Sequence, residues 1–159
     1  MSITLRPVVA ADDDFLFIVY ASTRRDEVAA FGWDISQQDA FLKMQCAAQQ
    51  RSFEMNGDGV SHQIILLDDK PVGRILVVRT TEEIRLVDIA LLPANQGHGI
   101  GTALIKELLD DGDRDGLPVR LMVLKGNRAA LLYDRLGFIR TGDNGVHIQM
   151  ERKSSELLL

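Results

Sequence analysis

The stretch NQGHGIGTAL, residues 95–104, places three glycines within five residues, directly before an apolar run with helical spacing. A glycine in regular structure costs about 0.5–1 kcal/mol relative to alanine, so such a cluster indicates a sharp turn or a ligand that approaches the backbone. The first amides of a helix have no partner within the helix, and they attract anions. The segment therefore has the chemistry of a phosphate or pyrophosphate site, and a glycine-rich turn without a ligand is the alternative.

Two familiar phosphate-binding loops do not fit this segment. Its spacing, G-x-G-x-G, differs from the G-x-G-x-x-G of dinucleotide-binding folds, and the strand after it lacks the acidic residue that would hold a ribose. It is not a Walker A loop either, because no Lys-Ser or Lys-Thr follows the glycines. A nucleotide-phosphate binder is disfavoured for these reasons, and the sequence predicts no metal site.

The elements that must position this loop follow from hydrophobic periodicity and turn residues. The sequence predicts a strand, two helices, three strands, a helix, a strand, a helix and two final strands. Their ranges are 2–8 (strand), 10–33 and 36–55 (helices), 61–69, 70–80 and 83–93 (strands), 101–116 (helix), 117–126 (strand), 127–138 (helix) and 138–152 (a hairpin). Ser36 is the expected N-cap of the second helix. The glycine run thus joins the end of a strand to the start of a helix.

The order of these elements predicts the fold class. A strand, a helix and a strand around residues 84–124 imply a parallel crossover, whereas the hairpins at 62–79 and 137–152 imply antiparallel pairs. An α/β fold of the α+β layered kind follows, with a mixed, mostly antiparallel central sheet of about seven strands flanked by about four helices. The length of 159 residues fits a single domain over residues 1–152, with a frayed tail over 153–159.

Composition and charge narrow the class of protein further. The net charge of −5 disfavours non-specific attraction to nucleic acid. The single cysteine, Cys46, rules out an intrachain disulfide and is expected to be a small buried apolar residue. No apolar run approaches the roughly 20 residues that span a membrane, and no signal peptide is visible, so a cytoplasmic protein is expected. The terminal leucines could pack on a partner, which leaves a homodimer open.

The glycine run and its surroundings match one family. Gln96-Gly97-His98-Gly99-Ile100-Gly101 resembles the Q/R-x-x-G-x-G/A pyrophosphate loop of the GNAT N-acetyltransferase superfamily, and Leu91-Leu92-Pro93 precedes it at the usual distance. The segment NRAALLYDRLGF, residues 127–138, resembles the asparagine, helix, tyrosine and GF segment that follows the next strand in that family. The similarity covers roughly residues 62–152, and it implies a GNAT-like acyl-CoA N-acyltransferase fold.

The resemblance implies acetyl-CoA as the acyl donor and assigns residues to it. The loop would bind the pyrophosphate through Gln96, Gly97, His98, Gly99, Ile100, Gly101 and Thr102. In this family two strands diverge at a bulge, so Ile89 and Leu91 would offer backbone groups to the pantetheine amides, and the Ile89 amide would polarise the thioester carbonyl. Asn127 would contact the cofactor arm, with a plain helix N-cap as its alternative role.

The implied reaction is direct transfer of an acetyl group to a primary amine of a small molecule, a protein or a peptide. Tyr133 maps onto the tyrosine that protonates the departing thiolate, and its alternative is core packing. Asp88 could accept the proton of the ammonium or anchor a cationic substrate, or it could pair with Arg85 or Arg74. Glu82 and Glu83 are expected to be solvated. A non-catalytic acyl-CoA-binding or regulatory module is the alternative function.

Choice of acceptor in this family usually depends on the segment between the first strand and the hairpin. Here that segment is STRRDEVAAFGWD, residues 22–34. A polar pocket with an aromatic wall could be lined by Arg24, Arg25, Asp26, Glu27 and Trp33. A solvated helix end with Trp33 as a core residue is the alternative.

Overall fold

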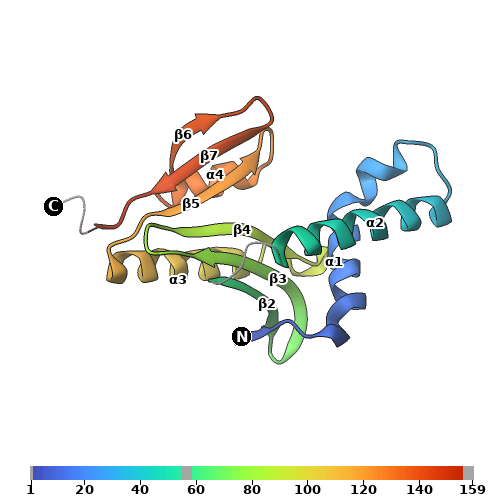
Figure 1. Ribbon diagram of the computed structural model, residues 1–159, viewed down its shortest axis with the longest axis horizontal. Coiled ribbons are helices and arrows are strands. Elements are labelled where there is room, and N and C mark those ends of the chain that lie inside the picture. Colours follow the sequence, from blue (N-terminus) through green and yellow to red (C-terminus); the bar gives the residue numbers. More distant parts are fainter. Residues whose placement is uncertain (1, 55–58, 156–159) are drawn as a thin grey trace. The chain divides into compact units, whose positions relative to one another are not determined.

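The structure is a computed structural model that describes residues 2–54 and 59–155. Its elements are β1 Ile3–Pro7, α1 Asp13–Ala29, α2 Ile35–Glu54, β2 Val60–Leu67, β3 Lys70–Arg79, β4 Ile84–Leu91, α3 Ile100–Asp115, β5 Val119–Leu124, α4 Ala129–Arg135, β6 Ile139–Asp143 and β7 His147–Arg152 (Figure 1). The seven strands form one sheet in the order β1-β2-β3-β4-β5-β7-β6, with β4 and β5 parallel. The predicted fold class is confirmed. Residues 55–58 and the end of the predicted tail, 156–159, lie outside the described residues.

The chain divides into two compact units, Met1–Ile75 with Ile89–Gln96, and Leu76–Asp88 with Gly97–Leu159. In the first unit β1 pairs with β2 in antiparallel register, from Ile3 opposite Leu67 to Pro7 opposite Gln63. Helices α1 and α2 pack side by side through a cluster of buried residues: Tyr20, Ala21, Val28, Leu42 and Cys46. Cys46 is 5% exposed, as predicted for a small apolar residue, and burial raises the pKa of its thiol.

Helix α2 begins at Ile35, one residue earlier than the sequence predicts. The Asp34 carboxylate accepts a hydrogen bond from the backbone amide of Gln37 at 2.8 Å. In return, the Gln37 side-chain oxygen accepts one from the backbone amide of Asp34 at 3.1 Å. This reciprocal pair is a capping box, and it satisfies two amides that the helix itself cannot. The predicted N-cap, Ser36, is therefore wrong, since Asp34 occupies that role and Ser36 lies within the helix.

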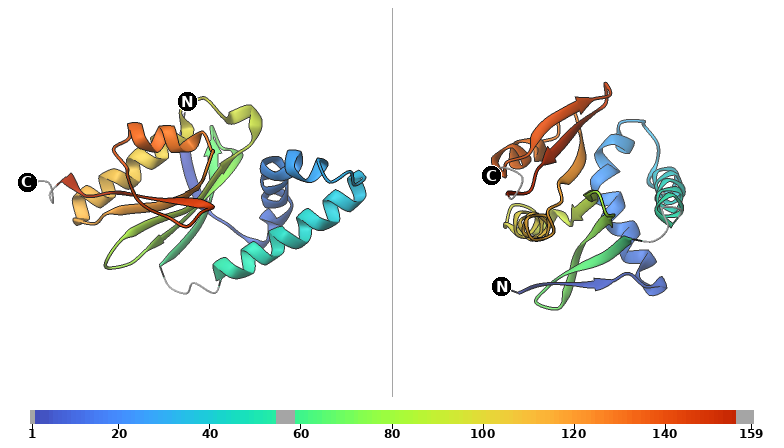
Figure 2. Two further views of the ribbon diagram at one scale, coloured as in Figure 1. Left: turned by 90° about the horizontal axis from the view of Figure 1, so that it is seen from above. Right: turned by 60° about the vertical axis from the view of Figure 1, so that its left-hand side comes forward.

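The second unit is built around β5, and it has one covered and one open face. Along β5 the side chains alternate, with Val119, Leu121 and Val123 buried and Met122 and Leu124 exposed. Helix α3 packs against the buried face so closely that a Cβ added at Gly112 would lie 3.1 Å from Val119 Cγ2. Helix α4 lies beside α3 (Figure 2). The opposite face of β5 and its neighbours is left for other contacts.

The end of the second unit is held to α3. Arg152 forms an ion pair with Asp113 at 2.9 Å, and the Ser155 amide donates to the same carboxylate at 2.8 Å. Ser154 between them is fully buried. The described part of the predicted tail, residues 153–155, thus packs on the domain.

Candidate functional site

The glycine run lies where the sequence places it, between β4 and α3. A short 3-10 turn, Pro93–Asn95, precedes it, and α3 begins at Ile100. Gly97 and Gly99 have φ of +78° and +83°, a region that only glycine enters at little cost. A Cβ at either position would meet no described atom within 4 Å. The glycines are therefore required by the backbone conformation and not by close packing, and the space outside the loop is open to a ligand.

Gln96, which precedes the run, has a role within the loop. Its side-chain amide donates to the Leu91 carbonyl oxygen at 3.0 Å, and the Leu92 amide donates to the Val72 carbonyl oxygen at 2.8 Å. These bonds tie the loop entrance to the end of β4. Ile89 and Leu91 lie at the end of that strand, and both are half-buried.

Strands β4 and β5 share only part of their length. Their parallel pairing runs from Ile84 opposite Val119 to Leu86 opposite Leu121, while β4 continues to Leu91 and β5 to Leu124. Beyond Leu86 this ladder has ended, so the backbone groups of β4 that face away from β3 can pair with a ligand that carries amides. The resemblance to the GNAT family implies a divergence of strands in this part of β4.

Tyr133 and Asp88, the two predicted catalytic residues, both belong to the second unit, and the charge of Asp88 acts on Tyr133. Tyr133 lies on α4, is 7% exposed and packs edge-to-face on Phe138, with ring centroids 5.6 Å apart. Burial raises the pKa of the Tyr133 hydroxyl, and the negative charge of Asp88 raises it further. The hydroxyl is thus held protonated at neutral pH, the state in which a tyrosine can donate a proton.

Asn127 forms the cap that the sequence analysis gives as its alternative role. Its side-chain oxygen accepts a hydrogen bond from the Ala129 backbone amide at 2.9 Å, and its backbone carbonyl oxygen accepts one from the Ala130 amide at 3.1 Å. These bonds start α4 at Ala129 and so fix the helix that carries Tyr133. The side-chain NH₂ group of Asn127 is not used by the bond to Ala129, so a contact with the cofactor arm stays compatible with the cap.

The Glu83 side chain is less exposed than the sequence analysis expects. Only 17% of its side chain is exposed, and its two oxygens lie 3.1 Å from Arg85 Nη2 and 3.7 Å from Arg120 Nη1. Arg120 also donates through Nε to Glu151 at 2.7 Å. The residues come from the start of β4, from β5 and from β7, and together they form a charged network on the open face of the second unit.

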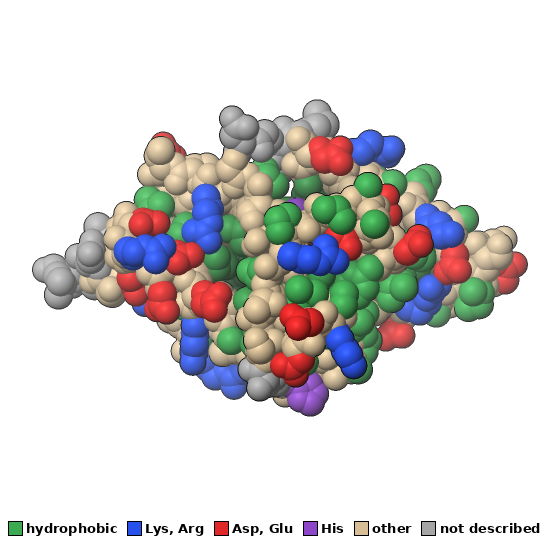
Figure 3. Space-filling view, turned by 90° about the horizontal axis from the view of Figure 1, so that it is seen from below, with side chains coloured by type: hydrophobic (Ala, Val, Ile, Leu, Met, Phe, Trp, Pro, Cys, Tyr) green, Lys and Arg blue, Asp and Glu red, His purple; other side chains and the backbone are tan. Residues whose placement is uncertain are grey.

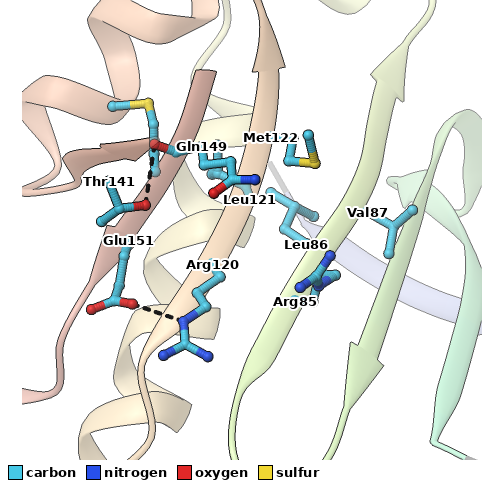
Figure 4. A pocket seen from close by; sticks show the side chains of 10 residues that line it. Arg85, Leu86, Val87, Arg120, Leu121, Met122, Thr141, Gln149 and Glu151 are labelled. Atoms are coloured by element: carbon cyan, nitrogen blue, oxygen red, sulfur yellow. Dashed lines mark hydrogen bonds and ion pairs between the residues drawn. The ribbon is translucent and has the colours of Figure 1, made fainter. Parts of the chain in front are cut away.

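This network borders a hollow of about 340 Å³ that the sequence analysis did not find (Figure 4). Its lining comes from four strands: Arg85, Leu86 and Val87 of β4, Arg120, Leu121 and Met122 of β5, Thr141 of β6, and Gln149, Met150 and Glu151 of β7. Apolar walls with a few convergent charged groups are typical of small-molecule sites. No local pattern in the sequence could reveal the hollow, because its residues meet only through strand register.

The segment between α1 and α2 forms an aromatic cluster in the first unit. Trp33 packs edge-to-face on Phe31 and Phe41, with ring centroids 5.1 and 5.2 Å away. Trp33 is 38% exposed and Phe31 57% exposed, so Trp33 is not a core residue. Arg25 pairs with Asp39 at 2.8 Å. The aromatic side chains of this segment are therefore partly open to solvent, and a polar pocket around them stays a prediction.

Other kinds of site find little support among the described residues. Over 2–54 and 59–155, no group of three or more His, Cys, Asp and Glu side chains could hold a metal ion. No described helix has the length and hydropathy required to cross a membrane. On the face of the molecule in Figure 3, acidic and basic side chains are interspersed, unlike the single-sign surface of a typical nucleic-acid binder.

Comparisons with known proteins agree with this architecture. A family model described as an acetyltransferase (GNAT) domain matches residues 21–151. The PaiA N-acetyltransferase of Thermoplasma acidophilum, solved in complex with coenzyme A, is similar with a TM-score of 0.71 and 18% identity, covering 96% of this chain and 99% of that one. None of the curated proteins compared with the sequence matches it.

Two further solved structures show the same fold. The ribosomal-protein-S18-alanine N-acetyltransferase of Escherichia coli has a TM-score of 0.65 and 21% identity, with coverage of 97% of this chain and 95% of that one. The N-acetyltransferase PseH of Campylobacter jejuni, in complex with acetyl coenzyme A, has a TM-score of 0.63 and 18% identity, with coverage of 97% and 100%.

Proposed function

Because the chain belongs to the GNAT acetyltransferase family, we propose that it transfers an acetyl group from acetyl-CoA directly to a primary amine of a small molecule or a peptide. The observation that carries this proposal is the loop before α3. Gly97 and Gly99 adopt positive φ there, and the space that a Cβ would enter is open. An extended anion can approach the first amides of α3 at this point, and the helix dipole favours its charge.

The loop residues 97–102 would bind the pyrophosphate of acetyl-CoA, which supplies the acetyl group as a reactive thioester. Gly97, His98, Gly99, Ile100, Gly101 and Thr102 contribute backbone amides, while Gln96 fixes the loop entrance through its bond to Leu91. Ile89 and Leu91 offer backbone groups to the pantetheine amides, and the Ile89 amide serves as an oxyanion donor. Asn127 positions α4 and contacts the cofactor arm.

Tyr133 would hold the proton that the departing CoA thiolate takes up. Its buried hydroxyl stays protonated at neutral pH, since burial and Asp88 both raise its pKa. The same Asp88 charge favours an incoming ammonium in its charged form, which helps capture of the acceptor and opposes its deprotonation. Asp88 therefore acts as an anchor for the acceptor, and water carries the amine proton away.

Asp88→Asn is expected to raise KM for the amine more than it lowers kcat, because the variant loses an attraction to the charged acceptor. Steady-state kinetics with one acetylated amine measures both constants. Glu82→Gln removes an exposed carboxylate just before the same strand and serves as the matched control. A normal KM with a strongly reduced kcat would show that Asp88 is instead the base.

The proposed function is tested by two measurements on the purified protein. Native mass spectrometry should detect acetyl-CoA or CoA bound to the chain, and added amines should accelerate release of the CoA thiol. Binding of acetyl-CoA without thiol release for any amine would identify a non-catalytic acyl-CoA-binding module. Absence of binding at saturating acetyl-CoA would refute the proposal.

A further inference from the structure

The hollow on the open face of the second unit has a cationic end. Arg85 and Arg120 are direct register partners on the parallel strands β4 and β5, and both side chains line the hollow. Their side chains are 49% and 41% exposed. Two guanidiniums on adjacent strands repel each other, so an arrangement of this kind needs anions around it.

Glu83 and Glu151 supply part of that negative charge and hold the two arginines in place. Glu83 contacts both guanidiniums but does not line the hollow. Glu151 contacts Arg120 and does line the hollow. The contact of Arg85 with Glu83 uses one nitrogen, Nη2, and a guanidinium has several N–H donors. The lining itself carries two guanidiniums and one carboxylate, which is suited to one further anionic group.

On β4 and β5 the lining becomes apolar toward the place where these two strands part, with Gln149 of β7 opposite Met122. Val87 and Met122 follow Arg85 and Arg120 by two residues on each strand, and Met122 is 43% exposed. The β4–β5 ladder has ended at this level. Asp88, whose negative charge acts on Tyr133, is the next residue on β4 and lies roughly 10 Å along the strand from Arg85, at about 3.3 Å per residue. Because side chains alternate along a strand, the Asp88 side chain lies on the opposite face from Arg85 and Val87, so an amine reaches it between the two strands, where the β4–β5 ladder has ended.

We propose that this hollow binds the acceptor and that the acceptor is an amine joined to a carboxylate by an apolar spacer. The carboxylate lies on Arg85 and Arg120, the spacer packs on Val87 and Met122, and the amine extends to the part of β4 around Asp88. The α-amine and α-carboxylate of one residue are at most about 3.6 Å apart and are too close together for this span. The inference rests on the proposed acetyl transfer and names the class of its substrate.

A series of ω-amino acids tests this class of acceptor. Glycine, β-alanine, γ-aminobutyrate, δ-aminovalerate and ε-aminocaproate are compared by the rate of CoA thiol release, with n-pentylamine as the analogue of ε-aminocaproate that lacks the carboxylate. We expect kcat/KM to rise with spacer length, and ε-aminocaproate to exceed n-pentylamine by about tenfold, as for one charge-assisted hydrogen bond. A best rate with glycine, or equal rates with and without the carboxylate, would overturn the proposal.

Arg85→Gln is expected to reduce the preference for ε-aminocaproate over n-pentylamine to near unity, with the affinity for acetyl-CoA unchanged. Arg79→Gln is the matched control, because Arg79 is a similarly exposed arginine that pairs with Asp111 of α3 at 2.9 Å, outside the hollow. An equal loss of preference in both variants would show that general surface charge causes it, and the proposal would fail.

A binding measurement separates this inference from the proposed function. The acetylated products ε-acetamidocaproate and N-pentylacetamide are titrated into the wild-type protein and Arg85→Gln by calorimetry, which requires no acetyl transfer. If ε-acetamidocaproate binds more tightly than N-pentylacetamide, and Arg85→Gln removes this difference, the inference about the hollow is supported. If no amine is acetylated in that case, only the proposed function fails. If neither product binds more tightly than the other, the inference fails whether or not acetyl transfer occurs.

Discussion

Tyr133→Phe is expected to lower kcat by about 10²–10⁴-fold while the affinity for acetyl-CoA stays unchanged, as for the loss of a general acid. The substitution removes only the hydroxyl, and the ring keeps its edge-to-face contact with Phe138. The variant should therefore keep the fold and lose the proton that the departing thiolate needs. Stopped-flow detection of CoA thiol release, together with calorimetry of acetyl-CoA binding, separates the two effects.

The pH profile of the same variant gives a second readout. The pKa of Tyr133 is raised above its usual value near 10 by burial and by Asp88, so the wild-type enzyme should lose activity only at more alkaline pH, as the hydroxyl ionises. The phenylalanine variant should lack this alkaline limb. Tyr20→Phe is the control, since Tyr20 is the other tyrosine of the chain and is 6% exposed in the core of α1 and α2. Full turnover by Tyr133→Phe would remove the residue from the mechanism.

Gly99→Val is expected to weaken acetyl-CoA binding by roughly a hundredfold, equivalent to one or two charge-assisted hydrogen bonds of about 1.5–3 kcal/mol each. Gly99 has φ of +83°, where a β-branched residue is strained, so the loop must change conformation or place a side chain in the open space before α3. Either outcome obstructs the approach of a pyrophosphate to the helix amides. Titration calorimetry with acetyl-CoA measures the loss directly.

Gly32→Val provides a closely matched control for backbone strain. Gly32 has φ of +76°, and a Cβ there would also meet no described atom within 4 Å, but the residue lies between α1 and α2. The two variants should lose similar thermal stability, and only Gly99→Val should lose affinity. Equal affinities for both variants would show that the glycine loop is not the pyrophosphate site.

The features that the sequence predicts well are those that local chemistry determines. The glycine run is visible because Gly97 and Gly99 adopt a backbone conformation that side chains oppose, with positive φ at both residues. The turn within the predicted hairpin at 138–152 likewise depends on local chemistry, because the Asp143 carboxylate accepts a hydrogen bond from the Gly145 amide at 2.7 Å. The order of strands and helices follows from the same short-range signals.

Features that depend on register or on competition between neighbours could not be predicted. Asp34 and Ser36 are both good N-caps, and only the bond between Asp34 and Gln37 decides between them. The hollow brings together Arg85, Arg120 and Glu151, which are more than thirty residues apart in the chain and meet because β5 pairs with β4 on one side and with β7 on the other. Periodicity assigns each side chain to a face of its strand but does not say which side chain lies opposite it.

The pairing of β1 with β2 has a consequence for the order of folding. Ile3 lies opposite Leu67, so this pair closes a loop of about sixty residues, whereas Val119 opposite Arg152 and Ile84 opposite Val119 close loops of little more than half that length. Loop-closure entropy rises with loop length, and contacts between residues distant in sequence slow folding. Chain entropy therefore favours formation of the strand pairs around the hollow before β1 reaches the sheet edge.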